Sequence, residues 1–263
     1  TAPQMVFDIN SNTQSQGTFV YPTDLGNGNF FFWGDDGVHG YEPWISNGTA
    51  AGTNILLDIE QGENSSICYE YPLGIIGDLL LFCADESNSG EELWATNLST
   101  LTTSIVKDIW PGIDGGCDCY GTHLNETTII FRANDGVHGN EPWITDGTNA
   151  GTTLFSDIYS GPSHSSPTMF TKVGNSIWFS ATDYSVNREI FITDGTIAGT
   201  YQPYITDPSP VSGSSASQYT LVGDLLFFTA DSPNEGYELH VAVISYDDNG
   251  VSYIEDETEI FYE

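Results

Sequence analysis

Short apolar runs recur along the chain and predict β-strands. The most apolar lie between turn-forming Gly, Asn, Asp or Pro residues, at 29–34, 79–84, 128–133, 176–181 and 225–230. Short runs rich in β-branched and aromatic residues, bounded in this way, are typical of strands. No stretch of useful length has the apolar period of a helix, so we expect almost no helix. Near-continuous apolarity predicts burial on both faces, as in sheets packed face to face.

The runs belong to a tandem repeat. Related sequences occupy 41–58 (YEPWISNGTAAGTNILLD), 91–108, 140–157 and 188–207, and a fifth copy begins at 237–245. Their anchor residues lie 48 to 50 positions apart: Trp44, Trp94, Trp143, Phe191 and His240. Each repeat contains four predicted strands, and tandem four-stranded units of about 40–50 residues are typical of a β-propeller. A linear β-solenoid has much shorter coils and is the weaker alternative.

We therefore predict an all-β fold, a five-bladed β-propeller of four-stranded antiparallel blades whose ring is closed by a terminal strand. It forms one domain over residues 1–263, with repeats near 17–66, 67–116, 117–166, 167–215 and 216–263. Residues 4–10 (QMVFDIN) read like the fourth strand of a repeat. Such an N-terminal strand would complete the last blade and leave no open edge.

The C-terminal residues compete for the same position. Residues 240–256 are two β-rich runs around Asn249-Gly250, which is a strong hairpin signal. Residues 257–263 alternate like a further strand, so 251–263 are a candidate extra strand for subunit contact. Which terminus closes the ring stays open at this point. The side chains expected in these assembly strands are Met5, Val6, Phe7, Val251, Tyr253, Ile254, Ile260 and Phe261.

The charge balance restricts the partners. The chain has 37 acidic residues against four Lys and Arg, a net charge of −33. Nucleic acids and anionic membranes need basic patches, so we expect neither as a partner. No apolar run reaches the about 18 residues that a transmembrane helix needs.

Cysteines and glycosylation signals favour a secreted or cell-surface protein. An even number of cysteines in one neighbourhood favours two disulfides over a metal site, with three pairings open: the candidates are Cys68, Cys83, Cys117 and Cys119. Zinc would prefer a CxxC spacing, which Cys117-Asp118-Cys119 lacks. Four N-x-S/T sequons predict N-linked glycans at Asn47, Asn64, Asn97 and Asn125.

The acidic loops between the second and third strands allow two interpretations. Each opens on an acidic residue or Asn and closes on Glu, as in DDGVHGYE (35–42) and NDGVHGNE (134–141). Oxygen-rich loops can bind Ca²⁺, with Asp36, Glu42, Asp135 and Glu141 as ligands. We favour the structural interpretation, in which Asp and Gly make a turn and the Glu bonds loop amides. No resident cofactor is expected beyond this alternative.

Local catalytic motifs are absent from the sequence. It contains no HExxH, no GxSxG and no phosphate-binding loop. We therefore expect the protein not to be an enzyme, and we name no catalytic residue.

The repeats resemble a known family. At ELWATNLS (92–99), EPWITDGTNAGT (141–152) and EIFITDGTIAGT (189–200) the chain is similar to the ELWxxDGT-repeat family, hyalin-like β-propeller repeats of secreted and cell-surface proteins. The resemblance covers most of the chain, with a degraded fifth copy. It implies the fold and an extracellular setting, and it transfers no catalytic residue.

Two functions are consistent with these features. The first is a non-enzymatic extracellular structural glycoprotein that self-associates head to tail, as a surface or filament subunit joined by terminal-strand exchange. The alternative is a carbohydrate-binding, lectin-like propeller or adhesin. Exposed Tyr and Trp near Asp would suit sugar binding, although Trp44, Trp94 and Trp143 read better as core residues.

Overall fold

The computed structural model describes residues 3–10, 18–68, 71–184, 188–203, 216–232 and 236–254. Regular structure there is β-strand apart from one 3-10 turn at Ala50–Gly52, so the all-β prediction is confirmed. No helix in these residues has the length and apolarity needed to cross a membrane. The chain forms two compact units, residues 1–119 with 147–149, and residues 120–146 with 150–263.

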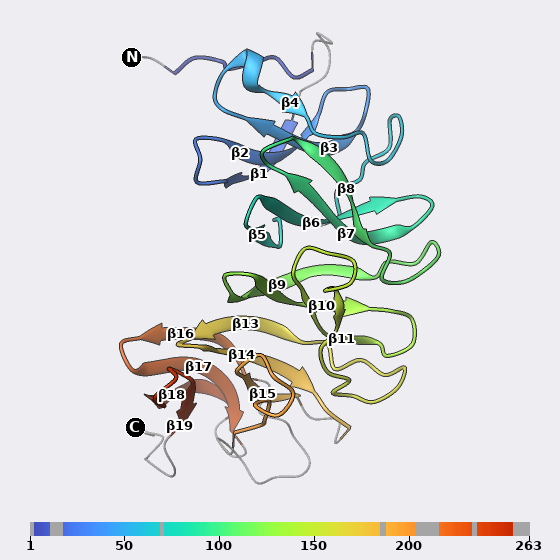
Figure 1. The fold of residues 1–263 in the computed structure, drawn as a ribbon. Coiled ribbons are helices and arrows are strands. Elements are labelled where there is room, and N and C mark those ends of the chain that lie inside the picture. Colours follow the sequence, from blue (N-terminus) through green and yellow to red (C-terminus); the bar gives the residue numbers. More distant parts are fainter. Residues whose placement is uncertain are drawn as a thin grey trace. The chain divides into compact units, whose positions relative to one another are not determined.

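Five antiparallel sheets follow one another along the chain, one for each repeat (Figure 1). The first contains β1 (Thr18–Asp24), β2 (Phe30–Asp35), β3 (Tyr41–Ser46) and β4 (Asn54–Ile55). The second contains β5 (Gly74–Ile76), β6 (Leu79–Glu86), β7 (Gly90–Asn97) and β8 (Thr102–Lys107). The third contains β9 (Cys117–Asn125), β10 (Thr128–Asn134), β11 (Asn140–Thr145) and β12 (Thr153–Leu154).

The last two sheets follow the same order. The fourth contains β13 (Thr168–Val173), β14 (Ser176–Thr182) and β15 (Arg188–Thr193), and Tyr201 bridges Ile192 where a fourth strand would lie. The fifth contains β16 (Ser217–Val222), β17 (Leu225–Ser232), β18 (Gly236–Tyr246) and β19 (Ser252–Ile254). Strands are paired in chain order within each sheet. The five predicted repeats are thus confirmed as five sheets, and closure of a ring stays a prediction.

The anchor residues are buried against the second strands. Each stands directly opposite a Phe: the pairs are Phe32–Trp44, Phe82–Trp94, Phe131–Trp143, Phe179–Phe191 and Phe228–His240. The exposed fraction of each anchor is between 2% and 8%. Side chains of neighbouring sheets pack together in one hydrophobic core. In the first unit, Phe31 and Trp33 of the first sheet pack with Leu80 and Phe82 of the second.

The recurring turn after the third strand has a local physical cause. Asn47 Oδ1 accepts hydrogen bonds from the N–H and Oγ1 of Thr49, and Thr49 Oγ1 accepts one from the N–H of Gly52. A Cβ on Gly52 would lie 2.0 Å from Asn47 Oδ1, so only glycine fits there. Asp194, Thr196 and Gly199 repeat this arrangement, which explains the recurring D/N-G-T-x-x-G spacing.

The C-terminal segment completes the fifth sheet. Asn249-Gly250 forms the predicted hairpin turn, and Ser252–Ile254 pair with β18 as its fourth strand. Tyr253 and Ile254 therefore pair within the fifth sheet of the same chain. Val251 forms a β-bridge with Gly174 of the fourth repeat. The predicted strand at residues 4–10 is not formed, and Met5, Val6 and Phe7 are exposed. Ile260 and Phe261 lie outside the described residues.

Candidate functional site

Glu42 and Glu141, two of the predicted metal ligands, have structural partners. Both side chains are fully buried. Glu42 accepts hydrogen bonds from the N–H groups of Ile59, Glu60 and Ser66 and from Ser66 Oγ, at 2.6 to 3.4 Å. Glu141 does the same with the equivalent residues of its repeat, including both donors of Ser165. Each Glu thus ties the linker after the fourth strand to the third strand.

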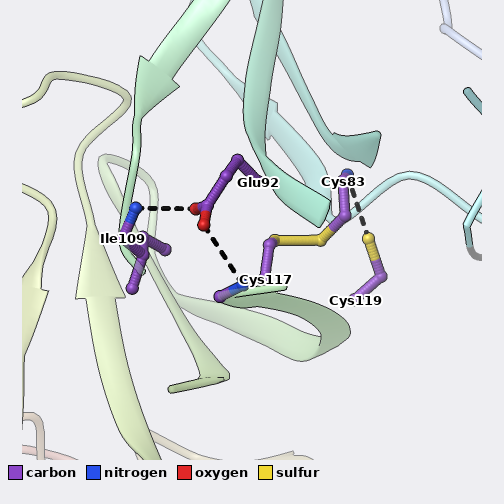
Figure 2. The surroundings of a disulfide bond; sticks show 6 residues. Cys83, Glu92, Ile109, Cys117 and Cys119 are labelled. Carbon is purple, nitrogen blue, oxygen red and sulfur yellow. Dashed lines mark hydrogen bonds between the residues drawn. A yellow bond between two sulfur atoms is a disulfide. The ribbon is translucent and has the colours of Figure 1, made fainter. Parts of the chain in front are cut away.

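Glu92 is the third member of this set. Its carboxylate accepts from the N–H groups of Ile109, Trp110 and Gly116, 17, 18 and 24 residues along the chain. Figure 2 shows the hydrogen bond from Ile109. Burial raises the pKa of Glu42 and of Glu92 to about 7, while the hydrogen bonds from amide donors lower it. All the donors point at the carboxylates, so these groups hold the backbone of the linker in place.

The other two predicted metal ligands, Asp36 and Asp135, close their own loops. Asp36 Oδ1 accepts from the N–H groups of Val38 and His39, and Oδ2 lies 2.7 Å from His39 Nδ1. Asp135 has the same contacts with Val137 and His138. The pKa of each His is raised, chiefly by the hydrogen bond to its Asp. Burial opposes ionisation of each Asp, but the hydrogen bonds with the His leave its pKa lowered.

These hydrogen bonds leave few acceptor positions on the four carboxylates for Ca²⁺. Among the buried carboxylate oxygens of the described residues, Oδ1 of Asp58 and Oδ1 of Asp157 have no hydrogen-bond partner. Within the described chain, the group of three or more His, Cys, Asp or Glu ligand atoms that come together consists of cysteines. Calcium binding therefore stays a prediction.

Two of the predicted glycosylation sites, Asn97 and Asn125, end strands β7 and β9, and Asn47 and Asn64 lie outside the strands. Asn47, Asn64 and Asn125 are exposed, and Asn97 is partly exposed. In three of them, at 47, 97 and 125, the side-chain oxygen accepts from amides two or three residues on. Glycosylation stays a prediction.

The cysteines form one of the two predicted disulfides. Cys83 on β6 is bonded to Cys117 on β9, 34 residues away (Figure 2). The second is not formed: Cys119 keeps its thiol, whose sulfur accepts a hydrogen bond from the N–H of Cys83 at 3.1 Å. Burial raises the pKa of the Cys119 thiol well above its usual range. Cys68 lies beside Ile67, which bridges Ala84.

A set of exposed large side chains recurs at one place in each repeat. It is the first-strand position, on the first strand or just before it, and its members lie 49 or 50 residues apart: Tyr21, Tyr71, Tyr120, Met169 and Gln218. The exposed fractions are 58% for Tyr71, 50% for Tyr120 and 47% for Met169. Gln218 is also exposed and Tyr21 is partly exposed. This position faces solvent, whereas the anchor residues are buried.

Backbone strain marks the same position. Tyr21, Met169 and Gln218 have φ values of +56°, +60° and +60°. Each lies in a register shift between the first and second strands of its sheet. Residues other than glycine rarely adopt this left-handed conformation, which costs about 1–2 kcal/mol. A bulge re-aims a side chain locally, and strained residues cluster at functional sites.

Three tyrosines at this position have aromatic or cationic neighbours. In the first unit, the rings of Tyr21 and Tyr71 meet edge to face, with centroids 5.4 Å apart. In the second unit, the Arg132 guanidinium lies 4.4 Å from the ring centroid of Tyr120. Such contacts hold exposed rings in one orientation at a small conformational cost.

Sequence reasoning missed the first-strand position. The three tryptophans Trp44, Trp94 and Trp143 stood out because their motif recurs, but they are core residues. The signal that could have found the tyrosines is their spacing, which matches the repeat. Their exposure could not be read from that spacing.

Comparison with known proteins gives distant structural likeness. No family model matches the chain, and no curated protein matches it, so the resemblance to ELWxxDGT repeats stays a prediction. TolB from Acinetobacter baumannii aligns over 90% of this chain and 56% of its own, at 13% identity and a TM-score of 0.45. A Mycobacterium tuberculosis puromycin-hydrolysing peptidase aligns over 86% of this chain and 34% of its own, at 12% identity and a TM-score of 0.48. A thermostable family-43 glycoside hydrolase aligns over 97% of both chains, at 10% identity and a TM-score of 0.36.

The comparison corrects the first functional prediction. The chain spans about half the length of TolB and about a third of the puromycin-hydrolysing peptidase. The similar solved structures include peptidases and glycoside hydrolases. The predictions of a non-enzymatic protein and of a structural filament subunit are contradicted by this result and are wrong. With identities of 10–13% and TM-scores of 0.36 to 0.48 in these three, the likeness transfers no activity to this chain.

Proposed function

We propose that the chain is a carbohydrate-binding module with its five sheets arranged as blades of a β-propeller. The observation that carries the proposal is the first-strand position, where three of five repeats present a tyrosine. Tyr71 and Tyr120 expose 58% and 50% of their surface. Tyr21 packs partly against the core of the first unit, but Tyr71 and Tyr120 expose half or more of their surface, and ligand binding accounts for such exposure.

Tyrosine suits a sugar ligand for physical reasons. Its ring offers a flat apolar face for the C–H groups of a sugar ring, and its hydroxyl can hydrogen-bond to sugar hydroxyls. Ring contacts hold Tyr21 to Tyr71 and Arg132 to Tyr120, so less side-chain freedom is lost on binding. A net charge of −33 repels polyanions, so the ligands should be neutral polysaccharides.

An extracellular setting is part of this proposal. The Cys83–Cys117 disulfide, the four sequons and the resemblance to ELWxxDGT repeats support it.

Binding to neutral polysaccharides tests the proposal. Affinity electrophoresis and calorimetry should show binding by the wild type, and Tyr71→Ala or Tyr120→Ala should each weaken it about tenfold, or about 1.4 kcal/mol. The matched control is Tyr184→Ala, because Tyr184 is 76% exposed and lies outside the first-strand position. Absence of wild-type binding across a broad polysaccharide panel, or an equal loss with Tyr184→Ala, would reject the proposal. Reducing-sugar release measured in the same mixtures would reveal catalysis.

A further inference from the structure

Three cysteine sulfurs gather in the first unit, although a disulfide uses only two of them. The Sγ atoms of Cys83, Cys117 and Cys119, here called the sulfur cluster, all lie within 4.8 Å of one another. Figure 2 shows Cys117 and Cys119 turned towards Cys83. Residues two apart on a strand point to the same face, so a Cys-x-Cys spacing on β9 presents both sulfurs to β6. This explains why the CxxC spacing typical of zinc sites is not needed here.

The surroundings of the cluster suit a cation held by thiolates. Cys83 is fully buried and Cys117 is 3% exposed. The N–H of Cys83 already donates to the sulfur of Cys119 at 3.1 Å, and such donors stabilise negative charge on sulfur. Burial disfavours a free thiolate at Cys119, and the negative charges of Asp118 and Glu91 do the same, so a bound cation is what stabilises it. The local potential is therefore negative and attracts cations.

We propose that reduction of the Cys83–Cys117 disulfide creates a three-thiolate binding site for a borderline-soft divalent cation such as Zn²⁺. Zinc–sulfur bonds of about 2.3 Å place tetrahedral sulfurs about 3.8 Å apart, which the cluster can match with small side-chain shifts. In the oxidised chain two of the three sulfurs are bonded to each other, and the site does not exist.

The chemistry balances with a dithiol as reductant. The dithiol transfers two electrons and two protons to the disulfide, which becomes two thiols, and the dithiol becomes a cyclic disulfide. Binding of the cation then releases three protons, one from each of Cys83, Cys117 and Cys119. The free energy of metal binding is coupled to folding, because the three sulfurs meet only in the folded chain.

Cobalt titration of the full chain tests the site. After anaerobic reduction and removal of the dithiol, the wild type should bind one Co²⁺ with thiolate charge-transfer absorption, and Zn²⁺ should displace it. Cys119→Ser should weaken binding by at least the about 10–100-fold that loss of an outer-shell partner costs. Cys68→Ser is the matched control, because Cys68 lies outside the sulfur cluster, and it should bind as the wild type does.

Near-ultraviolet circular dichroism tests the site even if the reduced chain unfolds. If reduction unfolds the chain, addition of Zn²⁺ should restore the folded spectrum in the wild type and not in Cys119→Ser. The proposal is overturned if the reduced chain, folded or unfolded, shows neither cobalt binding nor recovery with Zn²⁺. Equal binding by the oxidised chain or by Cys119→Ser would also overturn it.

Discussion

Glu42, Glu92 and Glu141 show what one residue contributes when a repeat reuses it. Each is fully buried and accepts backbone N–H groups from a linker 17 to 24 residues away. A buried amide without an acceptor costs about 1–3 kcal/mol, so these carboxylates are needed wherever the linker leaves the sheet. The acid was expected to bond amides of the loop that it closes. The structure corrects this prediction, because the donors lie in the linker after the fourth strand.

Replacing Glu92 by Gln tests this role. One carboxylate oxygen becomes an NH₂ group that cannot accept, so at least one N–H of Ile109, Trp110 or Gly116 loses its partner. We expect the free energy of unfolding to fall by about 1–3 kcal/mol in denaturant titration. Glu126→Gln, at an exposed turn, should change it by less than about 0.5 kcal/mol. Equal effects in the two variants would contradict the structural role.

The Asp–His loops predict a pH dependence. Because the pKa of His39 and of His138 is raised by the partner Asp, the folded chain binds protons more tightly there than the unfolded chain. This stabilisation is complete below the ordinary His pKa of about 6.5 and is lost as pH rises through the raised value. The total should stay below about 1 kcal/mol for each pair, since both rings are partly exposed.

Thermal unfolding between about pH 6 and pH 8 checks this dependence. The double variant His39→Gln/His138→Gln should show a flatter profile than the wild type. His123→Gln is the control and should keep the wild-type slope. A wild-type slope in the double variant would show that other groups set the pH dependence.

At the scale of strands, the first strands of the repeats do more than complete a sheet. The first strands carry a bulge in at least three repeats and present exposed side chains there. β9 carries Cys117 and Cys119, and its disulfide to β6 joins the first strand of the third repeat to the second sheet. The strand therefore connects two consecutive repeats covalently.

Removal of the disulfide should cost much of the stability. Closing a loop of 34 residues restricts the unfolded chain, which amounts to about 3–4 kcal/mol in the loop-entropy model. Cys83→Ala/Cys117→Ala should lose about that amount in guanidinium titration. Adding dithiol should destabilise the wild type and leave this double variant unchanged. A loss below about 1 kcal/mol would show that the bond does not constrain the unfolded chain as assumed.

Over the whole molecule, charge is the dominant property. A net charge of −33 spread over 263 residues opposes compaction through self-repulsion. Only four Lys and Arg offset it, and some of them serve local structure. Arg188, for example, donates to the carbonyl oxygens of Ser166 and Ser180. Stability should therefore depend on dissolved ions.

Salt should raise the melting temperature. Going from about 10 mM to about 150 mM NaCl shortens the screening length from about 30 Å to about 8 Å and weakens the repulsion. Choline chloride at equal ionic strength should give the same rise, since screening does not depend on the cation. A larger rise with CaCl₂ at matched ionic strength would support the predicted calcium loops. A melting temperature that falls or stays constant with NaCl would contradict dominant self-repulsion.

The repeat made much of the fold predictable from sequence. Strand runs such as 128–133 and 176–181 are local patterns, and they fall within β10 and β14. The Asn47 and Asp194 turns are also local, because their side chains cap amides two residues away. The candidate site was less predictable, since exposure of Tyr71 and burial of Trp94 depend on neighbours far along the chain.

The sequence by itself determined the all-β class, the five repeats, their turns and the acidic charge, because all of these follow from residue order over short distances. Only the tertiary structure decided that residues 252–254 complete the fifth sheet, that Cys83 bonds Cys117, and that Cys119 joins them. It also decided that Tyr71 and Tyr120 reach solvent, whereas burial of the anchor tryptophans was expected from their motif. These outcomes depend on which distant strands meet, and strand pairing is set by packing between elements rather than by local preference.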